Sequence, residues 1–179
     1  GMAEPSLVVS FAPCTDLSVA GARHFAKKRQ NEPQFQQKAT RMARLAEHFG
    51  CPYVVENPVS VLSTTWRKPD MICNPCDFSG YIEEEEAAHH EFPDIIPAQD
   101  RYMKKTCLWY GAGFMPPVRD LREPPTMVNP GWQKLGGKSA RTKYIRSLTP
   151  RGMSRAIYVA NCDIILQKVV DKAYLKRLL

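Results

Sequence analysis

The sequence has no apolar stretch of the roughly 18 residues that a membrane-spanning helix needs, so a membrane protein is not expected. Its first residues lack the basic flank and apolar core of a secretory signal, and Gly1 before Met2 is typical of a cloning scar. No internal repeat is present. These absences favour a soluble, cytoplasmic protein.

A disulfide framework is also lacking. The six cysteines are scattered without regular spacing, which in a cytoplasmic chain favours reduced thiols. They are Cys14, Cys51, Cys73, Cys76, Cys107 and Cys162. Each thiol therefore has to be interpreted in its own context.

The composition is that of a globular protein. With 179 residues, of which 44% are hydrophobic and 24% charged, the chain is large enough to bury a core of its own, and we expect one domain over 1–179. The net charge of +7 suits a polyanionic partner such as nucleic acid, although many basic proteins bind none.

A strand, a helix and a second strand are predicted within residues 2–58. The valine-rich run "SLVVSFA" (6–12) is typical of a strand covered on both faces. Residues 33–50 have helical spacing and close with Gly50, and "CPYVVENP" (51–58) predicts a second buried strand. The apolar helix positions are Phe35, Met42, Leu45, Ala46 and Phe49. This pattern predicts a βαβ unit with a right-handed crossover.

The rest of the chain predicts two further regions. Residues 59–103, with proline, tryptophan and an acidic run, predict a long irregular insertion. In 104–179 we expect a β-hairpin or two short strands at 106–115, a basic loop at 119–147 and a C-terminal helix that Thr149 caps. The fold class is therefore α/β, with a partial Rossmann-like sheet in which the parallel βαβ unit is joined by a hairpin.

Two reactive side chains follow the predicted strands. Open α/β sheets bind ligands at the carboxyl ends of their strands, where Cys14 and Glu56 stand. One reaction uses such a pair: a thiolate adds to carbon 6 of a cytosine ring while a carboxyl group hydrogen-bonds to ring nitrogen 3. Carbon 5 then takes a methyl group from a sulfonium donor, after the base has flipped out of the duplex. The alternatives are a buried, inert thiol and a solvated strand-end carboxylate.

Several motifs carry a family resemblance. "APCTDLSVAG" resembles the proline-cysteine motif of DNA cytosine 5-methyltransferases, "VVENP" their Glu-Asn motif, and "IRSLTPRGMSRAI" their late motif of Arg, Leu-Thr and a helix start. "PCTDLSVAGARHF", "ENPVSVLSTTWRKPD", "KKTCLWYGAGF" and "GGKSARTKYIRSLTPRG" are similar, in this order, to the small phage and prophage members of that family. The likeness extends from about residue 7 to residue 162.

The resemblance implies a methyltransferase-like sheet, DNA as partner and S-adenosylmethionine as methyl donor. By this likeness Cys14 is the nucleophile, Pro13 shapes its loop, Glu56 binds the ring and Asn57 braces the loop. A phage-encoded member would act in the cytoplasm of the bacterial host.

Two family features are missing. The usual arginine-bearing motif after the Glu-Asn strand is not evident, and no "FxGxG"-like turn precedes the cysteine strand. We therefore expect half of the donor site to be absent. Three explanations stay open: a split or truncated enzyme that an N-terminal-half polypeptide completes, a permuted domain, and a remnant without catalysis. An exposed sheet edge also favours a homodimer.

A basic segment late in the chain is the best candidate for phosphate contacts, since clustered cations bind nucleic acid through counterion release. Its members are Lys134, Lys138, Arg141, Lys143 and Arg146. The alternative is ordinary solubilising charge.

A cysteine pair in "CNPC" raises the question of zinc. Cys73 and Cys76 have the spacing of tetrahedral ligands, and His89 and His90 follow. Only one such pair exists, and neighbouring histidines rarely both face one ion. We therefore assign no metal site and favour a loop with two thiols.

The sequence thus predicts DNA cytosine carbon-5 methylation, as part of a split or truncated enzyme. The alternative is a non-catalytic nucleic-acid-binding or assembly protein derived from the same fold. A third reading is cysteine addition to a free pyrimidine nucleotide.

Overall fold

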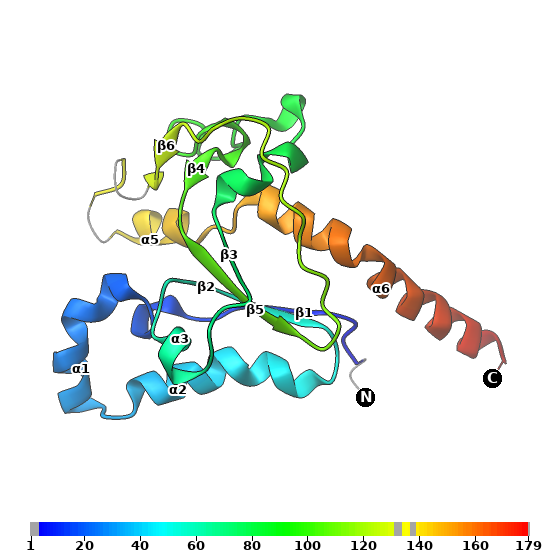
Figure 1. Ribbon diagram of the computed structural model, residues 1–179, viewed down its shortest axis with the longest axis horizontal. Coiled ribbons are helices and arrows are strands. Elements are labelled where there is room, and N and C mark those ends of the chain that lie inside the picture. Colours follow the sequence, from blue (N-terminus) through cyan, green and yellow to red (C-terminus); the bar gives the residue numbers. More distant parts are fainter. Residues whose placement is uncertain (1–3, 131–133, 137–138, 179) are drawn as a thin grey trace. The chain divides into compact units, whose positions relative to one another are not determined.

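A four-stranded mixed sheet organises the first of two compact units into which the chain divides (Figure 1). The computed structural model describes residues 4–130, 134–136 and 139–178. The first unit comprises Gly1–Ile72, Lys105–Phe114 and Asn161–Leu179, and the second unit comprises Cys73–Lys104 and Met115–Ala160. The predicted mixed α/β class is confirmed.

The sheet of the first unit contains the predicted parallel pair. Its strands, in order across the sheet, are β1 (Val8–Phe11), β2 (Tyr53–Pro58), β5 (Thr106–Gly111) and β3 (Met71–Cys73). β1 runs parallel to β2, with Phe11 opposite Glu56. β5 runs antiparallel to β2, with Leu108 opposite Glu56. In this order β1 lies at one edge of the sheet.

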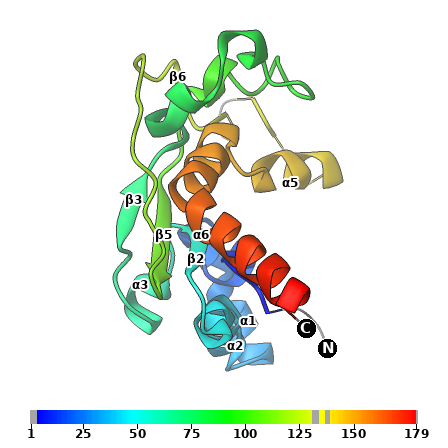
Figure 2. The same ribbon diagram turned by 90° about the vertical axis from the view of Figure 1, so that its right-hand side faces the viewer.

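The predicted helix connects the two parallel strands. The crossover contains the 3-10 turns η1 (Cys14–Asp16) and η2 (Val19–His24), then α1 (Phe25–Asn31), α2 (Phe35–Arg44) and the 3-10 turn η3 (Leu45–Phe49). It ends at Gly50, whose φ of 64° is left-handed and suits glycine. α2 lies on one side of the sheet (Figures 1 and 2), and its Ala43 belongs with Ala46, Val55 and Trp109 to one buried cluster. Small alanines let the helix approach the strands closely.

Two expectations about burial are wrong. β1 is not covered on both faces, because Val9 is 40% and Phe11 51% exposed. On the helix side, Met42, Leu45 and Phe49 are 53%, 56% and 54% exposed, although their spacing predicts a buried stripe. α2 instead buries Phe35, Ala39, Thr40 and Ala43, and Ala39 and Ala43 belong to the core cluster of the first unit.

Residues 106–111 form one strand, β5, where the sequence predicts a hairpin over 106–115. β5 pairs with the distant β2, and the chain then turns at Ala112 and Gly113, whose φ values are 53° and 83°. The stretch predicted as an irregular insertion contributes α3 (Leu62–Thr65) and the sheet strand β3. A strand that finds its partner far along the chain has no local turn signal, so sequence spacing alone cannot reveal the pairing.

The second unit is built from short elements around a small core. They are the 3-10 turns η4 (Pro75–Tyr81), η5 (Glu84–Glu86) and η6 (Ala98–Asp100), the parallel strands β4 (Tyr102–Met103) and β6 (Met127–Val128), α5 (Ala140–Ser147) and α6 (Arg151–Leu178), which belongs to this unit up to Ala160. The predicted loop at 119–147 is therefore wrong over α5. Ser139 starts that helix by accepting a hydrogen bond from Thr142 N, and neither proline nor glycine interrupts it.

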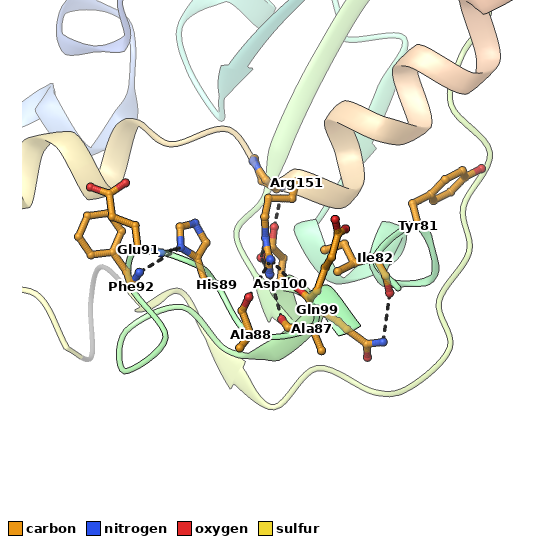
Figure 3. Close-up of polar contacts among 12 residues, drawn as sticks. Tyr81, Ile82, Ala87, Ala88, His89, Glu91, Phe92, Gln99, Asp100 and Arg151 are labelled. Carbon is orange, nitrogen blue, oxygen red and sulfur yellow. Dashed lines mark hydrogen bonds and ion pairs between the residues drawn. The ribbon is translucent and has the colours of Figure 1, made fainter. Parts of the chain in front are cut away.

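A buried ion pair links the start of α6 to η6 (Figure 3). The Asp100 carboxylate, 1% exposed as a residue, accepts hydrogen bonds from Arg151 N at 2.6 Å, Nε at 3.1 Å and Nη2 at 2.8 Å. Asp100 thus satisfies the first backbone donor of α6, a role that we expected of Thr149. The Arg151 guanidinium also donates to the carbonyls of Glu86, Ala87 and Ala88. It therefore ties the acidic run to the helix.

None of the helices in the described part of the chain combines the length and apolarity that crossing a bilayer requires.

We expect Gly152→Ala to destabilise the second unit. A Cβ at Gly152 would lie 2.2 Å from the Phe78 carbonyl oxygen, a backbone atom that cannot move aside cheaply. Overpacking of this kind costs about 1–3 kcal/mol of unfolding free energy. The matched control is Gly136→Ala, because a Cβ there meets nothing within 4 Å. Urea unfolding measures both variants, and equal stabilities would contradict the prediction.

Candidate active site

Cys14 stands in the turn that directly follows β1. Pro13 precedes it with φ −54° and ψ 113°, and η1 then begins at Cys14 itself. The Cys14 carbonyl accepts hydrogen bonds from Leu17 N at 3.1 Å and Ser18 N at 2.8 Å. Because the tight turn occupies the backbone and leaves the side chain outside, Cys14 is exposed. Access, the first requirement of a thiol nucleophile, is therefore met.

The turn is held to the loop that follows β2. Val61 N donates to the carbonyl of the fully buried Leu17 at 3.0 Å, and Val19 N donates to the Val59 carbonyl at 3.2 Å. Between them Ser18 and Ser60 form an isolated antiparallel bridge. The two loops at the carboxyl edge of the sheet are thus paired with each other, which gives Cys14 a defined position relative to β2. Sequence analysis missed this pairing, because no pattern signals it.

Asn57 connects the two strand ends directly. Its side chain is fully buried, and its Nδ2 donates to the Ala12 carbonyl at 2.9 Å, two residues before Cys14. Its Oδ1 is buried without a hydrogen-bond partner among the described residues. An amide in this position links β2 to the start of the cysteine turn.

Glu56 lies on β2. Its partner in the register is Phe11 of β1, which stands three residues before Cys14. Because side chains alternate along a strand, Glu56 points to the opposite face from Asn57. Its negative charge acts on Cys107 of β5. The pKa of the Cys107 thiol is raised mainly by burial and further by the Glu56 carboxylate. The parallel register therefore brings the Cys14 turn, which follows β1, and Glu56, two residues before the end of β2, toward the same carboxyl end of the sheet.

Two members of the basic segment are occupied in holding the second unit together. Lys134 Nζ donates to the Asp94 carbonyl at 2.5 Å, and Arg146 Nη2 donates to the Leu135 carbonyl at 2.9 Å. Lys138 lies outside the described residues. The spacing of the cations in the sequence gives no sign that Lys134 and Arg146 hydrogen-bond to backbone carbonyls of the same unit.

The remaining two cations lie on α5. The Arg141 guanidinium lies over the Phe92 ring, 5.6 Å from its centroid, and Arg141 and Lys143 are both exposed. They give α5 a positively charged surface that is open to solvent.

No three histidine, cysteine, aspartate or glutamate side chains in the described part of the chain cluster so as to hold a metal ion. Cys73 and Cys76 are both buried, and burial together with Asp77 raises the pKa of Cys76. His89 Nδ1 accepts hydrogen bonds from Glu91 N and Phe92 N, at 3.2 and 3.1 Å (Figure 3). That ring nitrogen therefore stabilises the turn at residues 89–92, which is a structural role.

Comparison with known proteins gives no match: no protein-family model, no curated protein sequence and no solved structure is similar to this chain. Its function is therefore inferred from the arrangement of its own residues.

We expect Cys14 to react first with a thiol reagent such as iodoacetamide. It is the exposed cysteine of the six, whereas Cys51, Cys73, Cys76 and Cys107 are buried and Cys162 is half-buried. When labelling is done at a pH near the ordinary thiol pKa of about 8.5, the raised pKa values of Cys76 and Cys107 keep these two thiols protonated and unreactive. Peptide mass spectrometry over time gives the order of labelling. Faster labelling of a buried cysteine would contradict the placement of Cys14.

Proposed function

We propose that this chain carries out the base-activating part of DNA cytosine carbon-5 methylation. The observation that carries the proposal is the parallel register of β1 and β2, since it brings the Cys14 turn and Glu56 to one edge of the sheet. The motifs around these residues resemble those of DNA cytosine 5-methyltransferases, and this resemblance supports the proposal.

The chemistry assigned to this edge has one covalent step. The Cys14 thiolate forms a bond to carbon 6 of the cytosine ring, and the electrons of the carbon 5–carbon 6 double bond move into the ring. The Glu56 carboxyl group hydrogen-bonds to ring nitrogen 3 and stabilises that charge. Pro13 sets the backbone before the nucleophile, and Asn57 holds the Ala12 carbonyl. These two are positioning residues, because neither touches the ring.

The methyl donor implied by the resemblance, S-adenosylmethionine, does not fit the described residues. β1 leads into the turn of Pro13 and Cys14, which contains no glycine. Gly111 ends β5, an antiparallel strand, and Gly113 follows it; the strand β6 comes between these glycines and α5. Neither turn is a glycine-rich turn between a parallel strand and a helix. We propose that the donor is held by residues of a separate polypeptide.

We expect the chain alone to exchange the carbon-5 hydrogen of cytosine in heavy water. After the thiolate adds, carbon 5 takes up a deuteron and then loses its proton, and the bond from sulfur to carbon 6 breaks. This cycle restores the ring and requires no methyl donor. Single-stranded DNA is the substrate, because its bases need no extrusion from a duplex. Mass spectrometry of the digested nucleosides measures a gain of one mass unit in deoxycytidine.

Variants make this test specific. Cys14→Ser should abolish exchange, and Glu56→Gln should slow it by about 10²-fold or more, a typical size for a lost acid–base group. Cys162→Ser is the control and should leave exchange unchanged, because that thiol lies on α6 and not in the loops that follow β1 and β2. Exchange that survives in Cys14→Ser would overturn the proposal. No exchange by the unaltered chain, with its DNA bound, would overturn it as well.

A second candidate function is nucleic-acid binding without catalysis. The observation that favours it is the exposed positive surface of α5, in a chain whose net charge is +7. Such binding depends on cations and salt and not on the thiol.

For this second function we expect Lys143→Ala to lower the salt dependence of DNA binding. Each lost phosphate contact reduces the slope of log K against log salt by about 0.9 on duplex DNA. Fluorescence anisotropy with a labelled duplex gives the slope. The control is Lys38→Ala, since Lys38 is an exposed lysine of α2 that pairs with Glu32. Equal slopes for the two variants would exclude α5 as the contact surface.

A further inference from the structure

From the exposed edge of the first unit, we propose that β1 and the outer flank of α2 and η3 bind a second copy of this chain about a two-fold axis. Three observations on the free chain meet at this edge: an open strand, an apolar pair on one face of the sheet and an apolar stripe on the helix above the other face. The inference does not depend on the proposed function.

The strand edge is open and carries no protection against pairing. In the described sheet β1 pairs with β2 and has no strand on its other side. Its four residues, Val8–Phe11, include neither charge nor proline. Natural proteins usually protect an edge with one of these devices, because its unpaired N–H and C=O groups recruit further strands. An edge strand without such protection is expected where a strand of another molecule pairs with it.

The first apolar surface is on the sheet face opposite α2. Val9 and Phe11 point to this face, because Val8 packs against the cluster on the α2 side and side chains alternate along the strand. They remain 40% and 51% exposed, whereas their neighbour in the register, Val54, is 1% exposed. Exposure on this face therefore increases toward the β1 edge.

The second apolar surface is the stripe Met42–Leu45–Phe49. Met42 near the end of α2 and Leu45 at the start of the 3-10 turn η3 are three residues apart and lie within about 60° of each other, and Phe49 ends η3. The opposite flank of the helix faces the interior of the sheet: Thr40 hydrogen-bonds to Thr65 at the end of α3, and Trp66 stacks on Trp109 of β5. Because Thr40 is about 160° from Met42 around the helix, the stripe faces the β1 edge.

A two-fold axis perpendicular to the sheet makes this edge self-complementary. The axis would place β1 antiparallel to the β1 of the second copy and both copies of α2 on the same side of the joined sheet. Strands are about 4.8 Å apart, so a helix above the β1–β2 pair stands about 5 Å from the axis. The two helices would then be about 10 Å apart, the upper end of the 8–10 Å range for packed helices. Each apolar stripe therefore meets its own copy.

The size of the surface is sufficient for a modest dimer. Five side chains that are 40–56% exposed, counted in two copies, leave on the order of 1,000 Å² to bury, near the lower bound of specific interfaces. A different α/β polypeptide that extended β1 would use the same edge, and the experiment separates this outcome from self-association.

The experiment is sedimentation equilibrium of the full chain at micromolar concentration. We expect a species of twice 20.3 kDa, and Leu45→Glu should weaken the dimer by at least tenfold in Kd. Val118→Glu is the matched control, because Val118 is a 70% exposed apolar residue of the second unit and should not affect the dimer. Thermal unfolding of each variant verifies that it is folded.

A cross-link tests the symmetry. Leu45→Cys in a Cys14→Ser background should form an intermolecular disulfide under mild oxidation, because the two-fold axis brings the stripes together. Val118→Cys in the same background should not. The proposal is overturned if the unaltered chain stays monomeric at ~100 µM, where a specific interface of this size should associate, or if Leu45→Glu dimerises as well as the control. A monomeric chain would indicate that a different polypeptide pairs with the β1 edge. None of these measurements depends on the proposed chemistry at the cytosine ring.

Discussion

The parallel pairing of β1 with β2 is the constraint on which the first unit depends. The register that sets Phe11 beside Glu56 decides at once where the Cys14 turn starts, which face Glu56 points to and which face Asn57 points to. A slip of one residue would exchange those faces, because side chains alternate along a strand. The buried amide of Asn57, bound to the Ala12 carbonyl, opposes such a slip. The candidate site is therefore a consequence of strand register.

The second unit depends on a different kind of interaction. Asp100 and Arg151 are 51 residues apart and form a buried ion pair in which the carboxylate also satisfies the first N–H of α6. Burying two charges is costly, and the hydrogen bonds from Arg151 to the carbonyls of Glu86, Ala87 and Ala88 offset part of that cost. Gln99 and Asp100 adopt left-handed φ values of 54° and 51°, which non-glycine residues rarely do. The ion pair and the Gln99 side chain, bonded to the Ile82 carbonyl, hold this turn in place (Figure 3).

The edge of β1 connects the fold to the two proposals. The same strand that delivers Cys14 to the carboxyl end of the sheet presents an unprotected edge along its other side. Catalysis would use the end of the strand, and association would use its length. The two uses do not compete, because the Cys14 turn lies beyond the four residues available for pairing.

The sequence by itself determined the βαβ unit. Valine-rich runs, helical spacing and the stop at Gly50 are local signals, and local signals suffice for elements that pack against their neighbours in the chain. It also placed Cys14 and Glu56 at strand ends. Tertiary structure alone decided which helix face is buried, because Met42, Leu45 and Phe49 have the spacing of a core stripe while the alanines achieve the closer approach. It alone decided that β5 joins β2, that Ser18 meets Ser60 and that Asp100 meets Arg151, because contacts between residues about 40 to 60 positions apart leave no periodic trace in the sequence.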